Sequence, residues 1–95
     1  MRRIDKDYLA KLRERNALIA DMRSPEYFRG GSIKGAVNLP YRNLINTLLK
    51  TDKKTPVILI GGEFDRKDMS SAANYAEQLG FSKVFMADFV SVRDE

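Results

Sequence analysis

A chain of 95 residues is long enough for one domain with a single hydrophobic core, and we expect residues 1–95 to form it. The chain has no cysteine and no histidine, which excludes disulfide bonds, thiolate chemistry and ordinary zinc sites. Its formal charge of +4 would allow nucleic-acid binding, but acidic residues interleave with the basic ones and no nucleic-acid motif is present. We therefore interpret these charges as solvated helix faces.

The first half of the chain is predicted to alternate helices and strands. A helix over 5–15 begins with a capping aspartate and has one apolar face, and a short strand over 17–20 follows it. A serine-proline pair indicates one turn of helix over 25–28. A brief strand over 36–39 then leads to an amphipathic helix over 42–49.

The second half contains the strand around which we expect the fold to be organised. Four consecutive apolar residues over 57–60 predict a strand buried on both faces, followed by a loop and a helix that stops at Gly80. A last strand is predicted over 83–86, and 88–95 either adds a weak helical turn or frays. Strands that alternate with helices predict an α/β fold with a parallel sheet of about five strands, covered by helices on both faces.

The order of residues in the first half resembles a known family signature. The chain reads LIADMRSPEYF over 18–28 and GGSIKGAVNLP over 30–40. This resembles the first signature of rhodanese-like domains, a strand with Asp-x-Arg-x-x-x-Glu and then Gly-His-Ile-x-Gly-Ala-x-Asn-x-Pro. The later strand, loop, helix and final strand resemble the rest of the family pattern. The resemblance implies a rhodanese-like fold over nearly the whole chain.

The resemblance also implies that the catalytic group is missing. Family members with sulfurtransferase activity place a persulfide-bearing cysteine directly after the strand that corresponds to 57–60. Here Gly61 has that position, and Glu63 is the alternative match if gaps are placed differently. Sulfur relay needs a nucleophile that is substantially ionised near neutral pH, which a thiolate provides and a serine without an adjacent base does not. We therefore predict that the domain is not an enzyme.

Candidate binding residues lie at the crevice rim and in the loop after the central strand. We interpret Asp21 and Arg23 as a structural pair at the rim, because charges near a buried strand end need partners. The candidate loop comprises Gly62, Glu63, Phe64, Asp65, Arg66, Lys67, Ser70 and Ser71. Its glycines either allow a ligand to approach or simply form a turn. Phe64 either anchors a partner or folds back over the empty pocket.

The loop also has the groups of a small anion site. Ser70 and Ser71 would lie at a helix N-terminus, where they either bind an oxyanion with backbone N–H groups or cap the helix. Arg66 and Lys67 would strengthen such a site. Three acids, Glu63, Asp65 and Asp68, oppose it, and they lack the spacing of a calcium loop, so we expect no metal.

Two hypotheses follow. The first is a non-catalytic rhodanese-like domain that serves as a protein-interaction or regulatory module, with loop 61–71 and rim 23–31 as its recognition surface. The alternative is a cysteine-free domain that binds a small oxyanion, or a degenerate sulfurtransferase retained as a structural part of an assembly. We expect another protein as the partner, no cofactor and no nucleic acid. The absence of an apolar run long enough for a membrane span and of a secretory signal predicts a cytoplasmic location.

Overall fold

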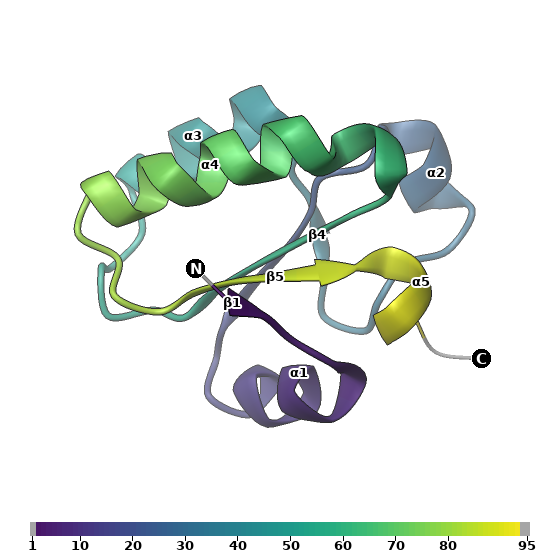
Figure 1. Ribbon diagram of the computed structural model, residues 1–95, viewed down its shortest axis with the longest axis horizontal. Coiled ribbons are helices and arrows are strands. Elements are labelled where there is room, and N and C mark those ends of the chain that lie inside the picture. The colour runs from purple at the N-terminus through teal and green to yellow at the C-terminus, as the bar shows by residue number, and fades with distance from the viewer. Residues whose placement is uncertain (1, 94–95) are drawn as a thin grey trace.

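Five parallel strands form the centre of the molecule in the order β1-β5-β4-β2-β3, in a computed structural model that describes residues 2–93 (Figure 1). The strands are β1 (Arg2–Arg3), β2 (Leu18–Asp21), β3 (Val37–Asn38), β4 (Val57–Gly61) and β5 (Val84–Asp88). The helices are α1 (Lys6–Arg13), α2 (Pro25–Arg29), α3 (Tyr41–Leu49), the 3-10 turn η1 (Glu63–Asp65), α4 (Arg66–Gln78) and α5 (Phe89–Val92). The predicted five-stranded parallel α/β sheet is confirmed.

Strand β4 is the central strand, and all of its residues are buried. It lies between β2 and β5, which explains why its sequence is continuously apolar instead of alternating. In this register Asp21 pairs with Ile60, and Gly61 pairs with Asp88. The carboxyl ends of three strands therefore meet at one edge of the sheet.

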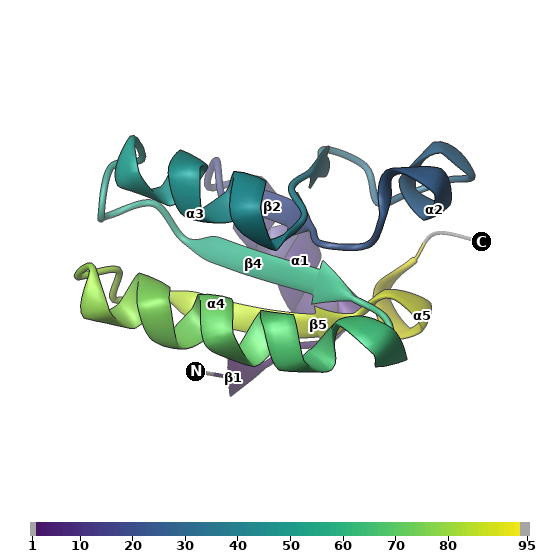
Figure 2. The same ribbon diagram turned by 90° about the horizontal axis from the view of Figure 1, so that it is seen from above.

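Helices cover both faces of the sheet (Figures 1 and 2). Helices α3 and α4 pack on one face, where fully buried alanines at 72, 73 and 76 let α4 lie close to the strands. Helix α1 packs on the other face through Leu9 and Leu12, which share a core cluster with Val92 of α5. Short helices α2 and α5 lie at the end of the sheet where the strands terminate (Figure 1).

Two features differ from the sequence prediction. Strand β1 was not predicted, because Arg2 and Arg3 form a charged edge strand whose pairing with β5 depends on the tertiary structure rather than on an apolar pattern. The last strand reaches Asp88, two residues beyond the predicted end at 86. Of the two alternatives given for 88–95, a helical turn or fraying, the helical turn is present over 89–92. Positions 94–95 of that prediction lie outside the described residues. None of the helices within 2–93 is long and apolar enough to cross a bilayer.

We expect Asp5→Ala to lower the free energy of unfolding by about 1 kcal/mol. The Asp5 carboxylate accepts the backbone N–H of Tyr8 at 2.9 Å, which satisfies a donor at the start of α1. Urea denaturation monitored by circular dichroism measures the loss. Asp5→Asn is the matched control, because it keeps a capping oxygen and should cost only a few tenths of that value. Equal losses in the two variants would contradict the capping role.

Candidate functional site

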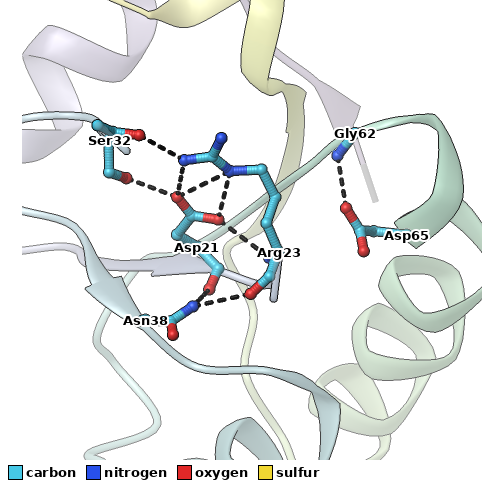
Figure 3. Close-up of polar contacts among 7 residues, drawn as sticks. Asp21, Arg23, Ser32, Asn38, Gly62 and Asp65 are labelled. Atoms are coloured by element: carbon cyan, nitrogen blue, oxygen red, sulfur yellow. Dashed lines mark hydrogen bonds and ion pairs between the residues drawn. The ribbon is translucent and has the colours of Figure 1, made fainter. Parts of the chain in front are cut away.

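The candidate site lies at the edge of the sheet where β2 and β4 end side by side. Crevices outside the carboxyl ends of parallel strands are the usual binding sites of α/β domains. Asp21 is the last residue of β2 and Gly61 is the last residue of β4. Figure 3 shows the polar contacts that the two strand ends and their following loops make.

Asp21 and Arg23 form a buried ion pair, as predicted (Figure 3). Asp21 is fully buried, and Arg23 is only 9% exposed. Arg23 Nη2 donates to Asp21 Oδ2 at 2.8 Å, and Arg23 Nε donates to Oδ1 at 3.1 Å. The backbone N–H of Arg23 also donates to Oδ1, at 3.0 Å. The pair closes a tight turn at the end of β2.

Three further residues complete this network. Sequence reasoning included only Gly31 among them, as the end of rim 23–31, and did not assign Ser32 or Asn38 to the site. The Ser32 hydroxyl donates to Asp21 Oδ2, and the Gly31 carbonyl accepts from Arg23 Nη2 at 2.7 Å. Asn38 Nδ2 donates to the backbone carbonyls of Asp21 and Arg23 at 3.1 and 2.8 Å. The network ties β3 and the segment before it to the end of β2. These residues lie within the first family signature, which was the available signal.

The positive charge of Arg23 is enclosed. Its guanidinium carbon lies 3.5 Å from the centroid of the Phe89 ring, at the start of α5. Asp21 neutralises the guanidinium within its plane, and Phe89 covers its face. Arg23 is therefore part of the scaffold of the crevice and does not present a free cation to a ligand.

Gly61 lies where no side chain fits. A Cβ atom at this position would lie 2.6 Å from Met69 Sδ and 2.8 Å from Asp65 Cβ. Real Cβ atoms essentially never approach other atoms so closely. At the neighbouring Gly62 the nearest atom to a Cβ would be Asp65 Oδ2 at 3.7 Å, an ordinary contact. The end of β4 is therefore packed against α4 and its preceding turn.

The loop after β4 is a single 3-10 turn held by its own carboxylate. Asp65 Oδ2 accepts the N–H of Gly62 at 2.8 Å, and the Asp65 N–H donates to the Gly62 carbonyl at 3.1 Å (Figure 3). The backbone amide of Gly62, at the start of the loop, is therefore already hydrogen-bonded to an acidic side chain of the same chain. A carboxylate in that place disfavours a bound oxyanion.

Helix α4 begins earlier than the sequence predicted. Its first residue is Arg66, so Lys67 and Asp68 belong to its first turn. Ser70 and Ser71 are exposed residues of the helix interior. The prediction that these serines cap the helix or bind an anion at its N-terminus is wrong, because the Asp65 turn starts the helix four residues before Ser70.

Phe64 points away from the core and is 93% exposed, so it does not fold back over the crevice. Across from it, Tyr27 of α2 is 63% exposed. Both aromatics border a hollow of about 380 Å³, which we call the aromatic hollow. Its lining consists of Arg23, Ser24, Tyr27, Gly62, Phe64 and Asp65. Residues predicted for the loop and for the rim therefore meet in one hollow. Tyr27 lies within the predicted rim, although it was not singled out.

The model of the Rhodanese-like domain family matches residues 5–88 of this chain. The chain belongs to the rhodanese-like domain family. Thiosulfate sulfurtransferase GlpE of Pseudomonas aeruginosa PAO1 is 29% identical over 86 residues, which cover 90% of this chain and 76% of that protein. GlpE of Pseudomonas fluorescens SBW25 is 30% identical over 87 residues, which cover 92% and 78% of the two chains.

Solved structures agree with this membership. The solution structure of the Rhodanese-like domain from the Anabaena sp. Alr3790 protein superposes with a TM-score of 0.70 at 22% identity, over 95% of this chain and 70% of that one. The crystal structure of the Rhodanese_3-like domain of the same protein has a TM-score of 0.61 at 25% identity, over 74% and 79%. The rhodanese-like domain described here thus has the fold of its family without a cysteine anywhere in its chain.

Proposed function

We propose that this rhodanese-like domain is non-catalytic and acts as a protein-interaction module. Its recognition surface would be the aromatic hollow, together with the rest of loop 61–71 and rim 23–31. The observation that carries the loss of catalysis is the lack of room for a side chain at Gly61, in a chain that has no cysteine. The relatives reported above are named as sulfurtransferases. This chain has no cysteine that could perform sulfur transfer.

A sulfur-transfer step needs a thiolate that attacks the sulfur donor and holds the transferred atom as a persulfide. The chain has no cysteine to supply that thiolate. At Gly61, the position that we match to the nucleophile, Met69 and Asp65 fill the space that a side chain would need. With this match, both the reactive group and the room for it are missing, and at Glu63, the alternative match, the side chain is not a sulfur nucleophile. Both matches support loss of catalysis rather than replacement of one nucleophile by another.

The oxyanion-binding alternative has less support. The Gly62 amide is bound to the Asp65 carboxylate, and the Arg23 charge is neutralised by Asp21. Ser70 and Ser71 lie in the interior of α4, away from the N-terminal amides that would bind an anion. By contrast, Phe64 and Tyr27 expose large aromatic surfaces, and exposed aromatics that border a hollow are typical of protein recognition sites.

An assay with thiosulfate and cyanide tests the loss of catalysis. We expect no thiocyanate above the level of a heat-denatured control, because the protein offers no sulfur nucleophile. The purified 95-residue chain would be compared with that control over a range of thiosulfate concentrations. Reproducible thiocyanate formation that scales with protein concentration would contradict the proposal.

Affinity capture from the native extract tests the recognition surface. We expect Phe64→Ala to lose a protein that the unmodified chain retains. Tyr41→Ala is the matched control, since Tyr41 is a partly exposed aromatic on α3 and does not line the aromatic hollow. Equal capture by the unmodified chain, Phe64→Ala and Tyr27→Ala would show that this hollow is not the interface.

A further inference from the structure

A second hollow lies at the end of the sheet where β4 and β5 begin, away from α2 and α5 (Figure 1). Its volume is about 330 Å³, which falls within the range of binding pockets. Among the described residues that line it, Arg2, Arg15 and Lys83 are cations and Glu77 is the one acid. We call it the basic hollow. It shares no lining residue with the aromatic hollow.

The three cations come from separate segments of the chain that the fold brings together. Arg2 lies in β1, which pairs with β5. Arg15 lies in the turn after α1, where its N–H donates to the Leu12 carbonyl at 2.9 Å. Lys83 directly precedes β5, and its carbonyl accepts the Val57 N–H at 2.9 Å. The position of each cation is therefore set by the sheet or by a turn beside it.

The side chain of Arg2 is held by two aromatic rings. Its guanidinium carbon lies 4.7 Å from the centroid of the Tyr8 ring and 5.4 Å from that of the Phe85 ring. The two rings pack edge to face, with their centroids 5.5 Å apart. A guanidinium that stacks on aromatic faces keeps its in-plane N–H groups for a planar acceptor such as a carboxylate. Arg2 can therefore offer a fork of donors at the basic hollow.

The charge of the basic hollow is positive. Three cations and one acid line it, so its lining carries a net charge of +2. None of the three cations forms an ion pair within residues 2–93. Segment 50–56, which leads to β4, carries three lysines and one aspartate. Segment 5–14 is neutral, because three acids face three bases there: Asp5, Asp7 and Glu14 against Lys6, Lys11 and Arg13. Neighbouring charges therefore do not reverse the sign.

We propose that the basic hollow binds an acidic segment of a partner protein, with one carboxylate on the Arg2 guanidinium. Three cations around one hollow attract carboxylates and repel basic segments. Single-stranded nucleic acid fits less well, because it needs aromatic faces for base stacking and Arg2 already lies over both rings. The inference goes beyond the proposed function, since this surface lies at the opposite end of the sheet from the aromatic hollow.

Two short peptides that differ only in charge test the proposal. The probes are acetylated, amidated hexapeptides in which glycine alternates with either glutamate or glutamine. Each is titrated into the ¹⁵N-labelled 95-residue chain while the amide signals of Arg15 and 82–85 are followed. We expect saturable shifts with the glutamate peptide and at least about tenfold weaker binding of the glutamine peptide. Raising the salt concentration from about 0.05 M to about 0.3 M should weaken binding of the glutamate peptide.

Matched variants separate a defined site from the general positive charge of the chain. Lys83→Gln and Arg15→Gln should each weaken binding of the glutamate peptide at least about threefold. Lys67→Gln is the control, because it removes the same charge from an exposed residue of α4 that does not line the basic hollow, and it should leave the affinity nearly unchanged. Arg2→Lys keeps the charge but removes the planar fork, and should weaken binding about threefold.

Several results would overturn the inference. Equal affinity of the two peptides would remove the role of charge, and equal weakening by Lys83→Gln and Lys67→Gln would remove the site. Unchanged binding by Arg2→Lys would remove the carboxylate from Arg2. Shifts confined to 24–27 and 62–65 would place the peptide at the aromatic hollow, and tighter binding of hexathymidylate would indicate a nucleic-acid surface. No saturable shift with the glutamate peptide would leave the basic hollow without its ligand.

Discussion

Replacing Asp21 with alanine is expected to lower the free energy of unfolding by about 3–5 kcal/mol. The carboxylate is fully buried and accepts hydrogen bonds from Arg23 and Ser32. Without it, the guanidinium of Arg23 would remain buried beside Phe89, and among residues 2–93 only the Gly31 carbonyl would still accept a hydrogen bond from it. An uncompensated buried charge is one of the few changes large enough to remove much of the stability of a small domain.

Urea denaturation measures this effect, and two variants keep it interpretable. Asp21→Asn retains the shape and part of the hydrogen bonding, so a smaller loss of about 1–3 kcal/mol is expected even if the alanine variant does not fold. Asp88→Ala breaks the ion pair with Arg3, whose atoms are 2.7 Å apart but partly exposed, and should cost at most about 1 kcal/mol. Equal effects of Asp21→Ala and Asp88→Ala would contradict the role given to burial.

Introducing a cysteine at Gly61 is expected not to create a sulfurtransferase. The new Cβ would meet Met69 Sδ at 2.6 Å and Asp65 Cβ at 2.8 Å, so the side chain could enter only if the Met69 side chain and the turn at Asp65 shifted. Overpacking of this kind costs about 1–3 kcal/mol. We expect Gly61→Cys to unfold at lower urea concentration and to form no thiocyanate from thiosulfate and cyanide.

Adjacent glycines supply the control for that prediction. Gly61→Ala should be destabilising by the same steric contacts, whereas Gly62→Ala adds a Cβ whose nearest atom is 3.7 Å away. Neither glycine is among the residues with positive φ, so backbone strain does not distinguish them. Thermal and urea unfolding of the two alanine variants would isolate the packing effect. A folded, active Gly61→Cys variant would show that the crevice can still hold the nucleophile.

The fold could be predicted because its signals are local and repeated. The continuous apolar run of β4 indicates burial on both faces, and the small residues on α4 indicate close packing on the sheet. The charged strand β1 could not be predicted, because its pairing with β5 comes from the tertiary structure. Helix α4 starts at Arg66, earlier than predicted, because the Asp65 carboxylate accepts the Gly62 N–H and holds a turn directly before the helix.

The candidate site was predictable only in part. The Asp21–Arg23 pair follows from two charges at the end of a buried strand, but Ser32 and Asn38 reach it from a distant segment. Tyr27 and Phe64 line the same hollow because α2 and η1 lie at the same end of the sheet, which no local pattern encodes. Whether these residues bind a partner stays a prediction.

The two outer strands also limit how a partner can attach. One edge strand of the sheet is β1, which has only the two residues Arg2–Arg3, and the other is β3, which has only Val37–Asn38. A foreign peptide that extends a sheet needs a longer run of free main-chain donors and acceptors than these two-residue strands provide, and the charges of Arg2 and Arg3 oppose edge-to-edge association at their margin. We therefore expect the proposed partner to be recognised through side chains rather than through the backbone.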